Sequence, residues 1–415
     1  MLHQFVRSAA AVAVVAAFSS AAQAGGFQLT EQSALALGRA YAGVGVDGSD
    51  VAGLYYNPAT MTLHKGTQAQ LGAVGVGLNL DYVSKQPGGS DENGRKKPEV
   101  VPHAFFSHQI NDQVWAGVAL TVPFGLSTDY SNRWDQAAEG TDAMIKVIDL
   151  NPNIAWKMND KLSFGAGVSL QYADAKLGFN KTKPLPLGMT NVEVDGYAWG
   201  WNVGMMWTPI ETVRIGLSYR SKVSHEVDGT FTVQNAIRHP QTGATLIPNQ
   251  FDASVTMDAP AWAMLSAAWD VNHWLSLYGT FRWADWSSFE KLDVDTNNPL
   301  IGTQSMPKKW KDTYLMTVGY DARINDFWTL RGGLGYETST IDVPETRTGT
   351  IPDADRYWLA IGSSFHWTKD FQTDVAFAHL RGVHERSLYN AQGNEIGRFR
   401  KLDAYLLGVQ AQYRF

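Results

Sequence analysis

Apolar and polar residues alternate along most of the chain from about residue 67 onward. In 163–172 every even position is apolar, and every odd position is Ser, Gly or Gln. The C-terminal segment 405–415 repeats this pattern, with aromatic or aliphatic residues at all odd positions. Because successive side chains of a strand point to opposite faces, each such segment predicts a strand with one apolar face. Strands of soluble sandwiches alternate in the same way, so the pattern alone does not identify what surrounds the sheet.

The connections between these segments discriminate better than the segments themselves. Every second connection is tiny, as at Asn111-Asp112 and Asn159-Asp160, whereas the intervening ones are long and polar. Short turns at one end, long loops at the other and an even strand number are typical of an outer-membrane barrel, which also leaves no unpaired edge in lipid. The sequence therefore predicts an all-β, 14-stranded antiparallel transmembrane barrel spanning 67–415, with strands at 67–82, 99–110, 113–130, 144–158, 161–180, 194–208, 211–227, 251–270, 274–292, 309–323, 327–340, 356–368, 371–384 and 402–415.

Aromatic residues support a membrane setting. Six tryptophans fall within a few residues of the short turns, where an interfacial girdle forms in such barrels: Trp115, Trp156, Trp207, Trp274, Trp328 and Trp367. The alternative is that Trp simply favours strands. The chain also ends in Phe415 on the apolar face, which resembles the terminal signal of bacterial outer-membrane barrels.

The first 24 residues have the composition of a secretory signal peptide. Arg7 precedes the ten-residue apolar stretch Ala9–Phe18, and Ala22-Gln23-Ala24 provides a small-x-small cleavage site. A membrane anchor is the alternative, but ten residues are too few to cross a hydrocarbon layer of about 30 Å. We therefore expect an exported chain whose mature form begins at Gly25.

Residues 25–66 alternate little and are too short to form a core of their own. As a periplasmic tail, this segment would leave eight large apolar residues in water. A barrel of fourteen strands is wide enough to leave a lumen that must be filled. We therefore predict that 25–66 form a plug inside the barrel.

Composition excludes several other classes of protein. A mean hydropathy of −0.21 excludes a polytopic helical membrane protein, and 15 Trp, 16 Tyr and 18 Phe in 415 residues exclude disorder. No Cys is present, which excludes disulfides, thiol nucleophiles and zinc–thiolate sites. With a net charge of −6, no broad basic field exists for nucleic acid. We expect no metal or cofactor, and the absence of a Gly-x-Ser-x-Gly elbow or His-x-x-x-His pair argues against an enzyme.

Several short motifs occur in order between residue 25 and Phe415: Gly26–Glu31, Asn57-Pro58-Ala59, Pro123-Phe124-Gly125-Leu126, Ser218–Ser221 and Ile351–Trp358. Together they resemble the FadL/TodX family of outer-membrane transporters for hydrophobic compounds, in which Asn-Pro-Ala is a plug signature. The resemblance implies capture of an apolar molecule by the outer loops and binding in a lumenal pocket beside the plug. It also implies lateral release through a gap made by a kinked third strand.

Residues of the third strand suit such a gap. Pro123 cannot donate a ladder hydrogen bond and Gly125 has no side chain, so the strand is expected to bend or bulge around Phe124. The alternative is an ordinary bulge with no transport role. We predict that Pro123, Phe124 and Gly125 form the lateral gate.

Ligand-contacting residues are predicted from the resemblance and from the last strand. Phe27 matches the family's N-terminal Phe, and the inward face of 402–415 becomes apolar toward the outside at Leu406 and Leu402. Fatty-acid-transporting relatives carry a basic residue shortly after a Tyr-Ala-x-Ala-Lys stretch, but here Tyr172–Lys176 is followed by Leu177-Gly178-Phe179. Lys308, Lys309 and Lys311 offer a substitute cation, although a solvated lysine cluster is the alternative. The predicted ligand contacts are Phe27, Phe179, Leu402, Leu406 and Lys311.

These features favour a multi-pass protein of the bacterial outer membrane that transports long-chain fatty acids and acts as a monomer. Aromatic or aliphatic hydrocarbons are the alternative substrates. A general diffusion porin and an adhesin or scaffold barrel are alternatives of other classes. The expected partners are a hydrophobic small molecule, outer-membrane lipid and lipopolysaccharide, whose phosphates Arg95, Lys96 and Lys97 of the first outer loop could contact if that loop is not simply solvated.

Overall fold

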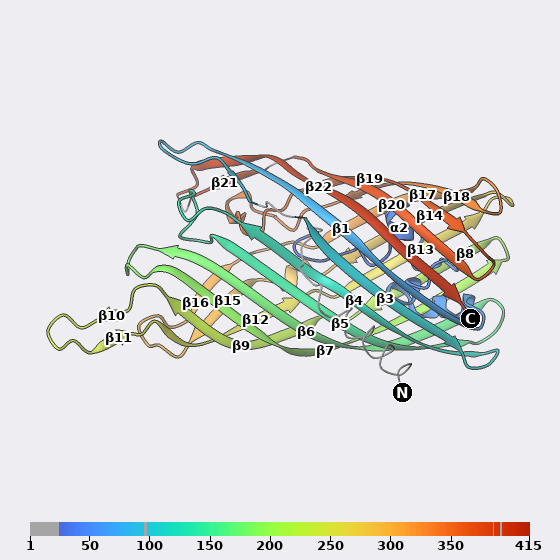
Figure 1. Cartoon of the computed structure of the whole chain (residues 1–415), viewed down its shortest axis with the longest axis horizontal. Helices are drawn as coiled ribbons and strands as arrows, with labels where there is room; N and C mark the ends of the chain where they lie inside the picture. The colour runs from blue at the N-terminus through green and yellow to red at the C-terminus, as the bar shows by residue number, and fades with distance from the viewer. Residues whose placement is uncertain (1–24, 95–97, 385, 391) are drawn as a thin grey trace, which may run out of the picture.

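A computed structural model describes residues 25–94, 98–384, 386–390 and 392–415. The predicted signal peptide 1–24 and the basic residues Arg95, Lys96 and Lys97 lie outside these ranges. Antiparallel strands close into one barrel, seen from the side in Figure 1. Closure comes from the last strand, which pairs with the first from Gln68↔Arg414 to Ser84↔Gly397. Among the described residues, no helix combines the length and the apolar character needed to cross a membrane.

The predicted fourteen-strand barrel is confirmed. Two of its strands are interrupted, the seventh between β8 and β9 and the eighth between β12 and β13. In chain order the strands are β1 (Thr67–Ser84), β3 (Glu99–Gln109), β4 (Val114–Asp129), β5 (Asp142–Lys157), β6 (Leu162–Lys181), β7 (Gly188–Ile210), β8 (Val213–Arg220) with β9 (Val223–Val233), β12 (Gln250–Ala259) with β13 (Trp262–Asp270), β14 (Leu275–Ala284), β17 (Thr313–Arg323), β18 (Trp328–Glu337), β19 (Arg356–His366), β20 (Phe371–Gly382) and β22 (Glu395–Arg414).

The outer ends differ most from the sequence-based strand limits. β7 and β22 begin at Gly188 and Glu395 rather than at 194 and 402, because both continue pairing in the polar loop region where no lipid imposes an apolar face. β14 ends at Ala284, earlier than predicted, at the short helix η2 (Trp286–Ser288). The long loops contain further short strands. The hairpin of β10 and β11 projects beyond the barrel in Figure 1. The short strands are β2 (Glu92–Asn93), β10 (Ile237–Arg238), β11 (Thr245–Ile247), β15 (Lys291–Thr296), β16 (Gln304–Pro307) and β21 (Ser387–Tyr389), together with the 3-10 helix η3 (Pro344–Thr346).

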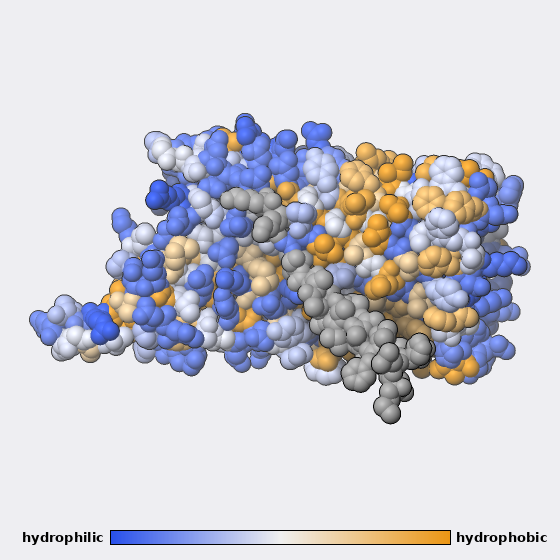
Figure 2. Space-filling view, in the orientation of Figure 1, coloured by the Kyte–Doolittle hydropathy of each residue, from blue (hydrophilic) through white to orange (hydrophobic). Residues whose placement is uncertain are grey.

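The outer wall carries an apolar belt. Figure 2 shows apolar residues gathered in a band between the short turns and the loops, with hydrophilic residues at both ends. Trp156, Trp207, Trp274 and Trp367 are exposed at the turn end, as a girdle requires. Trp115 is a correction, because it is only 2% exposed and its indole Nε1 donates to the carbonyl of His64, 2.7 Å away. It lies on the inward face of β4 and packs against the plug.

Residues 25–66 lie inside the barrel and bury the apolar side chains that a free tail would expose. Three short helices form there: α2 (Ala34–Leu37), α3 (Gly53–Tyr56) and η1 (Pro58–Leu63). Ser33 caps α2, with its Oγ accepting from the amide of Ala36 at 3.0 Å. α2 packs against β19, β20, β22 and β1. The buried side chains are Phe27, Leu29, Leu35, Leu37, Leu54, Tyr55, Tyr56 and Met61.

Glycines of the wall let the plug approach the strand backbone. A Cβ on Gly204 of β7 would overlap Asn57 Oδ1, and one on Gly165 of β6 would lie 2.6 Å from the amide nitrogen of Ala59. Asn57 Nδ2 donates to the carbonyl of Met205 on β7 at 3.0 Å, while its Oδ1 accepts from the amide of Ala59 at the start of η1. The Asn57-Pro58-Ala59 segment therefore lies directly on two strands.

Candidate functional site

The wall of the barrel is incomplete between β3 and β4. In the described residues these strands pair only from Ala104↔Leu120 to Gln109↔Trp115, although β3 continues outward along β1 as far as Glu99. On its other edge, the register of β4 with β5 shifts between Thr121 and Phe124, as in a bulge. Residues 121–126 are all buried instead of alternating, so β4 turns into the lumen here. The bend therefore lies at the position that Pro123 and Gly125 predict from the sequence.

The first residues of the plug occupy this opening. Gln28 forms an antiparallel bridge with Phe124. The amide of Gly125 donates to the carbonyl of Phe27 at 2.9 Å, and the amide of Leu29 donates to the carbonyl of Pro123 at 2.8 Å. The plug thus provides β4 with backbone partners at the level where its pairing with β3 has ended.

Gln32 adds a second clamp to the same strand. Its Nε2 donates to the carbonyl of Val122 at 2.7 Å, and its Oε1 accepts from the amide of Val122 at 3.2 Å. A side-chain amide here reproduces both bonds of a strand partner. The bulged residue of β4 is therefore satisfied without β3.

Phe27 lies at the centre of an aromatic cluster just inside the gap. Its ring centroid is 4.7 Å from that of Trp286, 5.7 Å from Phe289, 5.9 Å from Phe124 and 6.1 Å from Trp310. The Phe27 side chain is fully buried. Rings from the plug, the gap strand, η2 and the segment before β17 therefore enclose one apolar space, which Phe27 fills. Edge-on packing of this kind stabilises aromatic pairs beyond the area they bury.

A second apolar site lies among the outer loops. A cavity of about 250 Å³ opens between the outer ends of β6, β7 and β9 and the loop between β15 and β16. Predicted ligand contact Phe179 is part of its wall, and Lys181 and Lys183 also line it. Its apolar lining comprises Phe179, Pro184, Leu185, Leu187, Val192, Phe231, Val294, Leu300, Ile301 and Met306.

Along the chain, Lys308 lies between Met306, which lines the outer cavity, and Trp310, which belongs to the aromatic cluster. Met306, Lys308 and Trp310 alternate with exposed residues, so all three side chains point inward. Lys308 is 4% exposed, and its amide donates to the carbonyl of Glu290 at 2.8 Å. Burial lowers the pKa of Lys308 to about 8, although the charge of Glu139 acts in the opposite direction. No ion pair of its Nζ is formed with any residue that the structure describes.

Lys311 is placed differently from the prediction. Its side chain is 46% exposed, and its Nζ lies 3.9 Å from Asp342 Oδ1. In the connection between β16 and β17, Lys308 and Trp310 are buried whereas Lys309 and Lys311 are exposed. The structure therefore brings Lys308, rather than Lys311, into the lumen.

Leu402 and Leu406 belong to different apolar clusters, and only Leu406 is in the one that contains Phe27 and Phe179. Leu406 is fully buried in the core around the plug, and Leu402 packs at the edge of a separate outer cluster that contains Tyr82 and Phe399. The polar inward residues of the same strand bind the plug, because Gln410 Oε1 accepts from the amide of Ala34 at 2.7 Å. The polarity gradient along β22 thus reflects plug contacts as well as the lumen.

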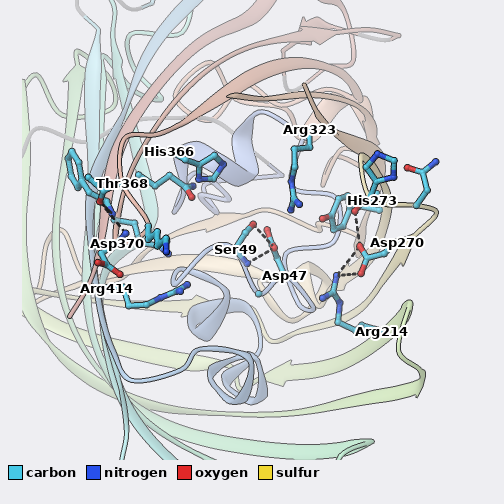
Figure 3. A pocket seen from close by; sticks show the side chains of 18 residues that line it. Asp47, Ser49, Arg214, Asp270, His273, Arg323, His366, Thr368, Asp370 and Arg414 are labelled. Carbon is cyan, nitrogen blue, oxygen red and sulfur yellow. Dashed lines mark hydrogen bonds and ion pairs between the residues drawn. The ribbon is translucent and has the colours of Figure 1, made fainter. Parts of the chain in front are cut away.

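The periplasmic end is polar. Figure 3 shows a cavity of about 510 Å³ in which Asp47 and Ser49 of the plug face Arg214, Asp270 and other charged residues of the wall. Deeper in, the buried guanidinium of Arg39 forms ion pairs with Asp47 and, at 3.2 Å, with Asp321 of β17. Charged groups on both sides of this contact give an apolar molecule no favourable path along the barrel axis.

Sequence reasoning missed the aromatic partners of Phe27. Trp286, Phe289 and Trp310 fall inside or beside predicted strands and were not distinguished from their neighbours. One signal was present, because Trp286 is a large apolar residue at an even position, whereas the large apolar residues of 275–284 alternate on odd positions. Lys308 was identified together with Lys309 and Lys311, and only the structure separates them.

Comparison with known proteins agrees with this architecture. Residues 15–415 match the family described as outer membrane protein transport protein (OMPP1/FadL/TodX). The chain is 28% identical over 417 residues to the long-chain fatty acid transport protein of Escherichia coli K12, covering 91% of this chain and 92% of that one. It is also 28% identical to outer membrane protein P1 of Haemophilus influenzae, covering the whole of both chains.

Solved structures show the same fold. A Pseudomonas aeruginosa FadL homologue superposes with a TM-score of 0.82 at 23% identity, covering 94% of this chain and all of the other. The Pseudomonas putida toluene transporter TodX superposes with a TM-score of 0.73 at 18% identity, with the same coverage. With a plugged barrel, a gap in its wall and a family match over nearly the whole length, this chain belongs to the OMPP1/FadL/TodX family, non-enzymatic β-barrels that transport hydrophobic compounds across the bacterial outer membrane.

Proposed function

We propose that this protein takes up long-chain fatty acids and releases them sideways into the outer membrane through the opening between β3 and β4. The observation that carries the proposal is the pairing of Phe27 and Leu29 with Gly125 and Pro123. A movable N-terminal segment, rather than a fixed neighbouring strand, completes the wall there. Its withdrawal would open the barrel without breaking any pair between two barrel strands.

The proposed route begins at the outer cavity and ends at the gap. Met306 lines that cavity, and Trp310 belongs to the aromatic cluster around Phe27. Met306, Lys308 and Trp310 thus provide inward-facing side chains between the outer cavity and the aromatic cluster. The chain would replace Phe27 among the rings and then leave past Gly125.

Energetics favour the lateral exit over an axial one. Apolar surface gains roughly 25 cal/mol per Å² on leaving water, so release into the bilayer is downhill and release into the periplasm is not. The axial path also ends at the charged contact of Arg39 with Asp47 and Asp321. Opening that end would leave buried charges without partners.

Lys308 favours fatty acids over neutral hydrocarbons. A buried ammonium group without an ion-pair partner is costly, and a ligand carboxylate would compensate that cost. The E. coli relative bears the name long-chain fatty acid transport protein, whereas the likeness to the toluene transporter TodX is one of fold. Both points support a carboxylate ligand.

A reversible disulfide tests the gate. Since the chain has no Cys, Gln28→Cys with Phe124→Cys introduces the only pair, at positions that oppose each other in an antiparallel bridge. Such positions lie about 4.5–5.5 Å apart, within the range for a disulfide. The oxidised variant should lose oleate uptake by cells, and a reductant should restore it.

A matched control joins two wall strands away from the gap. Ala267→Cys with Gly279→Cys places a disulfide across directly opposed residues of β13 and β14, which should leave uptake unchanged. Uptake at the wild-type rate by the fully oxidised Gln28–Phe124 variant would refute the lateral gate. Toluene uptake is measured in parallel to distinguish the two candidate substrates. If the wild-type protein accelerated uptake of toluene but not of oleate, the fatty-acid assignment would be refuted and the lateral gate would not.

A further inference from the structure

A basic patch lies on the outward face of the barrel at the outer ends of β20 and β22. Arg381, Arg398, Arg400 and Lys401 are all exposed there, and Arg386 lies next to them. A cavity of about 400 Å³ is lined by His384, Arg386, Ser387, Arg398, Phe399 and Arg400. None of these residues takes part in the transport route described above.

Carboxylates neutralise only a small part of the patch. Arg400 pairs with Asp81 through two hydrogen bonds of 3.0 and 2.9 Å. Arg386 donates to the backbone carbonyls of Gly382 and Arg400. Within the described ranges, no acidic side chain forms an ion pair with Arg381, Arg398 or Lys401. Among the residues that the structure describes, Arg381, Arg398 and Lys401 therefore lack an ion-pair partner on this face.

Nearby acidic groups have partners of their own. Asp355 accepts from His384 Nδ1 at 2.9 Å, and Asp403 lies 3.8 Å from His379 Nε2. Glu395 forms an ion pair with Lys85. Among the described residues, basic side chains are therefore gathered on this exposed face although the whole chain is acidic.

The patch lies at the height of lipid headgroups. On the same outward face, Tyr357 lies opposite Arg381, and His379 and Tyr405 follow toward the periplasm with their rings stacked 4.7 Å apart. Beyond these rings come exposed Leu359, Phe377 and Leu407. In the view of Figure 2, the wall changes from hydrophilic near the loops to apolar along β22. An aromatic belt marks the membrane interface, so the basic residues face the outer leaflet's headgroups.

We infer that this patch binds the phosphates of a phosphorylated, multiply acylated glycolipid of the outer leaflet, the lipid A part of lipopolysaccharide. Arginine forks suit phosphate oxygens, and the cavity gives a headgroup room between Arg386 and Arg398. The acyl chains would lie along Leu359, Phe377 and Leu407. This assigns a lipid contact to the outward face of β20 and β22, whose residues take no part in the proposed transport route.

Native mass spectrometry of the detergent-purified full chain tests the inference. Bisphosphorylated hexa-acyl lipid A should bind the wild-type protein, whereas dephosphorylated lipid A and inorganic phosphate should bind far more weakly. The variant Arg381→Gln/Arg398→Gln/Lys401→Gln should bind about 100-fold more weakly, since each basic residue near anionic lipid contributes about fivefold. The control Lys65→Gln/Lys161→Gln/Lys369→Gln removes the same charge at the periplasmic turns and should bind normally.

Equal binding of lipid A by the first variant and by the control would overturn the inference. So would equal binding of phosphorylated and dephosphorylated lipid A, a comparison that needs only wild-type protein and holds even if the variant fails to assemble. Preference for phosphatidylglycerol over lipid A would likewise overturn it, because the patch would then recognise negative charge without the glycolipid.

Discussion

Replacing Lys308 by methionine should weaken fatty-acid binding while leaving the barrel intact. Methionine keeps the apolar stem that packs in the lumen and removes the ammonium group that, in our proposal, meets the carboxylate. A hydrogen bond to a charged group contributes about 1.5–3 kcal/mol, which corresponds to a roughly 10- to 100-fold loss of affinity. The stability of the barrel should not fall, because the variant also removes a buried charge that lacks an ion-pair partner.

The same residue predicts a pH dependence with a definite sign. Burial lowers the pKa of Lys308 to about 8 in the ligand-free protein. The lysine is therefore charged below this pH and becomes neutral above it, so attraction for a carboxylate is present at pH 7 and is lost as pH rises. Between pH 8 and 9 the affinity for laurate should fall by up to about tenfold. The methionine variant should show a flat profile across this range.

Binding of laurate, kept below its aggregation concentration, is measured by calorimetry on detergent-purified protein. Lys311→Met serves as the matched control, because it removes an equal charge from a solvent-exposed position three residues along the chain. Methyl laurate, which lacks the carboxylate, should bind wild type and Lys308→Met equally. If Lys308→Met lowered the affinities for laurate and methyl laurate by the same factor, the lysine would act through packing and our reasoning would be wrong.

Three further variants test other contacts. Phe27→Ala should leave the barrel assembled but change ligand affinity, measured by the same calorimetry, because the aromatic cluster loses its central ring; unchanged affinity and uptake would exclude Phe27 from the pocket. Gly204→Val should displace Asn57 from β7 and raise ion conductance in planar bilayers, since its side chain needs the space of Asn57 Oδ1; conductance equal to wild type would show that the plug tolerates the clash. Gly125→Arg should fill the opening, so that ligand still binds but oleate uptake fails, whereas wild-type uptake by a heat-resistant, folded variant would contradict the gate.

Strand number and loop polarity were readable from the sequence because lipid imposes a strict alternation on every segment that crosses the membrane. Where lipid is absent, the sequence signal weakens. The outer extensions of β7 and β22 were missed for this reason, and so was the early end of β14 before Trp286.

Side-chain roles in the lumen were harder to predict, because plug and wall residues from distant parts of the chain share one interior. Trp115 looked like a girdle residue by its distance from a turn, yet the inward face of β4 directs it to His64 of the plug. From the sequence, Lys308 and Lys311 are equally good candidates for the cation that meets a carboxylate. Both lie in the connection between β16 and β17, where burial of one and exposure of the other follow from the local backbone course and not from a strand pattern.

A wall completed by a movable segment has a consequence for the transport cycle. While the N-terminal segment is in place, the amide of Gly125 and the carbonyl of Pro123 are both satisfied by it. An apolar cargo offers neither a donor nor an acceptor, so passage of the cargo leaves these two groups unpaired beside lipid, where each costs several kcal/mol. In the proposed gate, this cost disfavours the open state and favours reclosure once the cargo has passed. In the proposed cycle, re-forming these two bonds favours the return of the N-terminal segment, so the same backbone groups that close the wall also help to reset it.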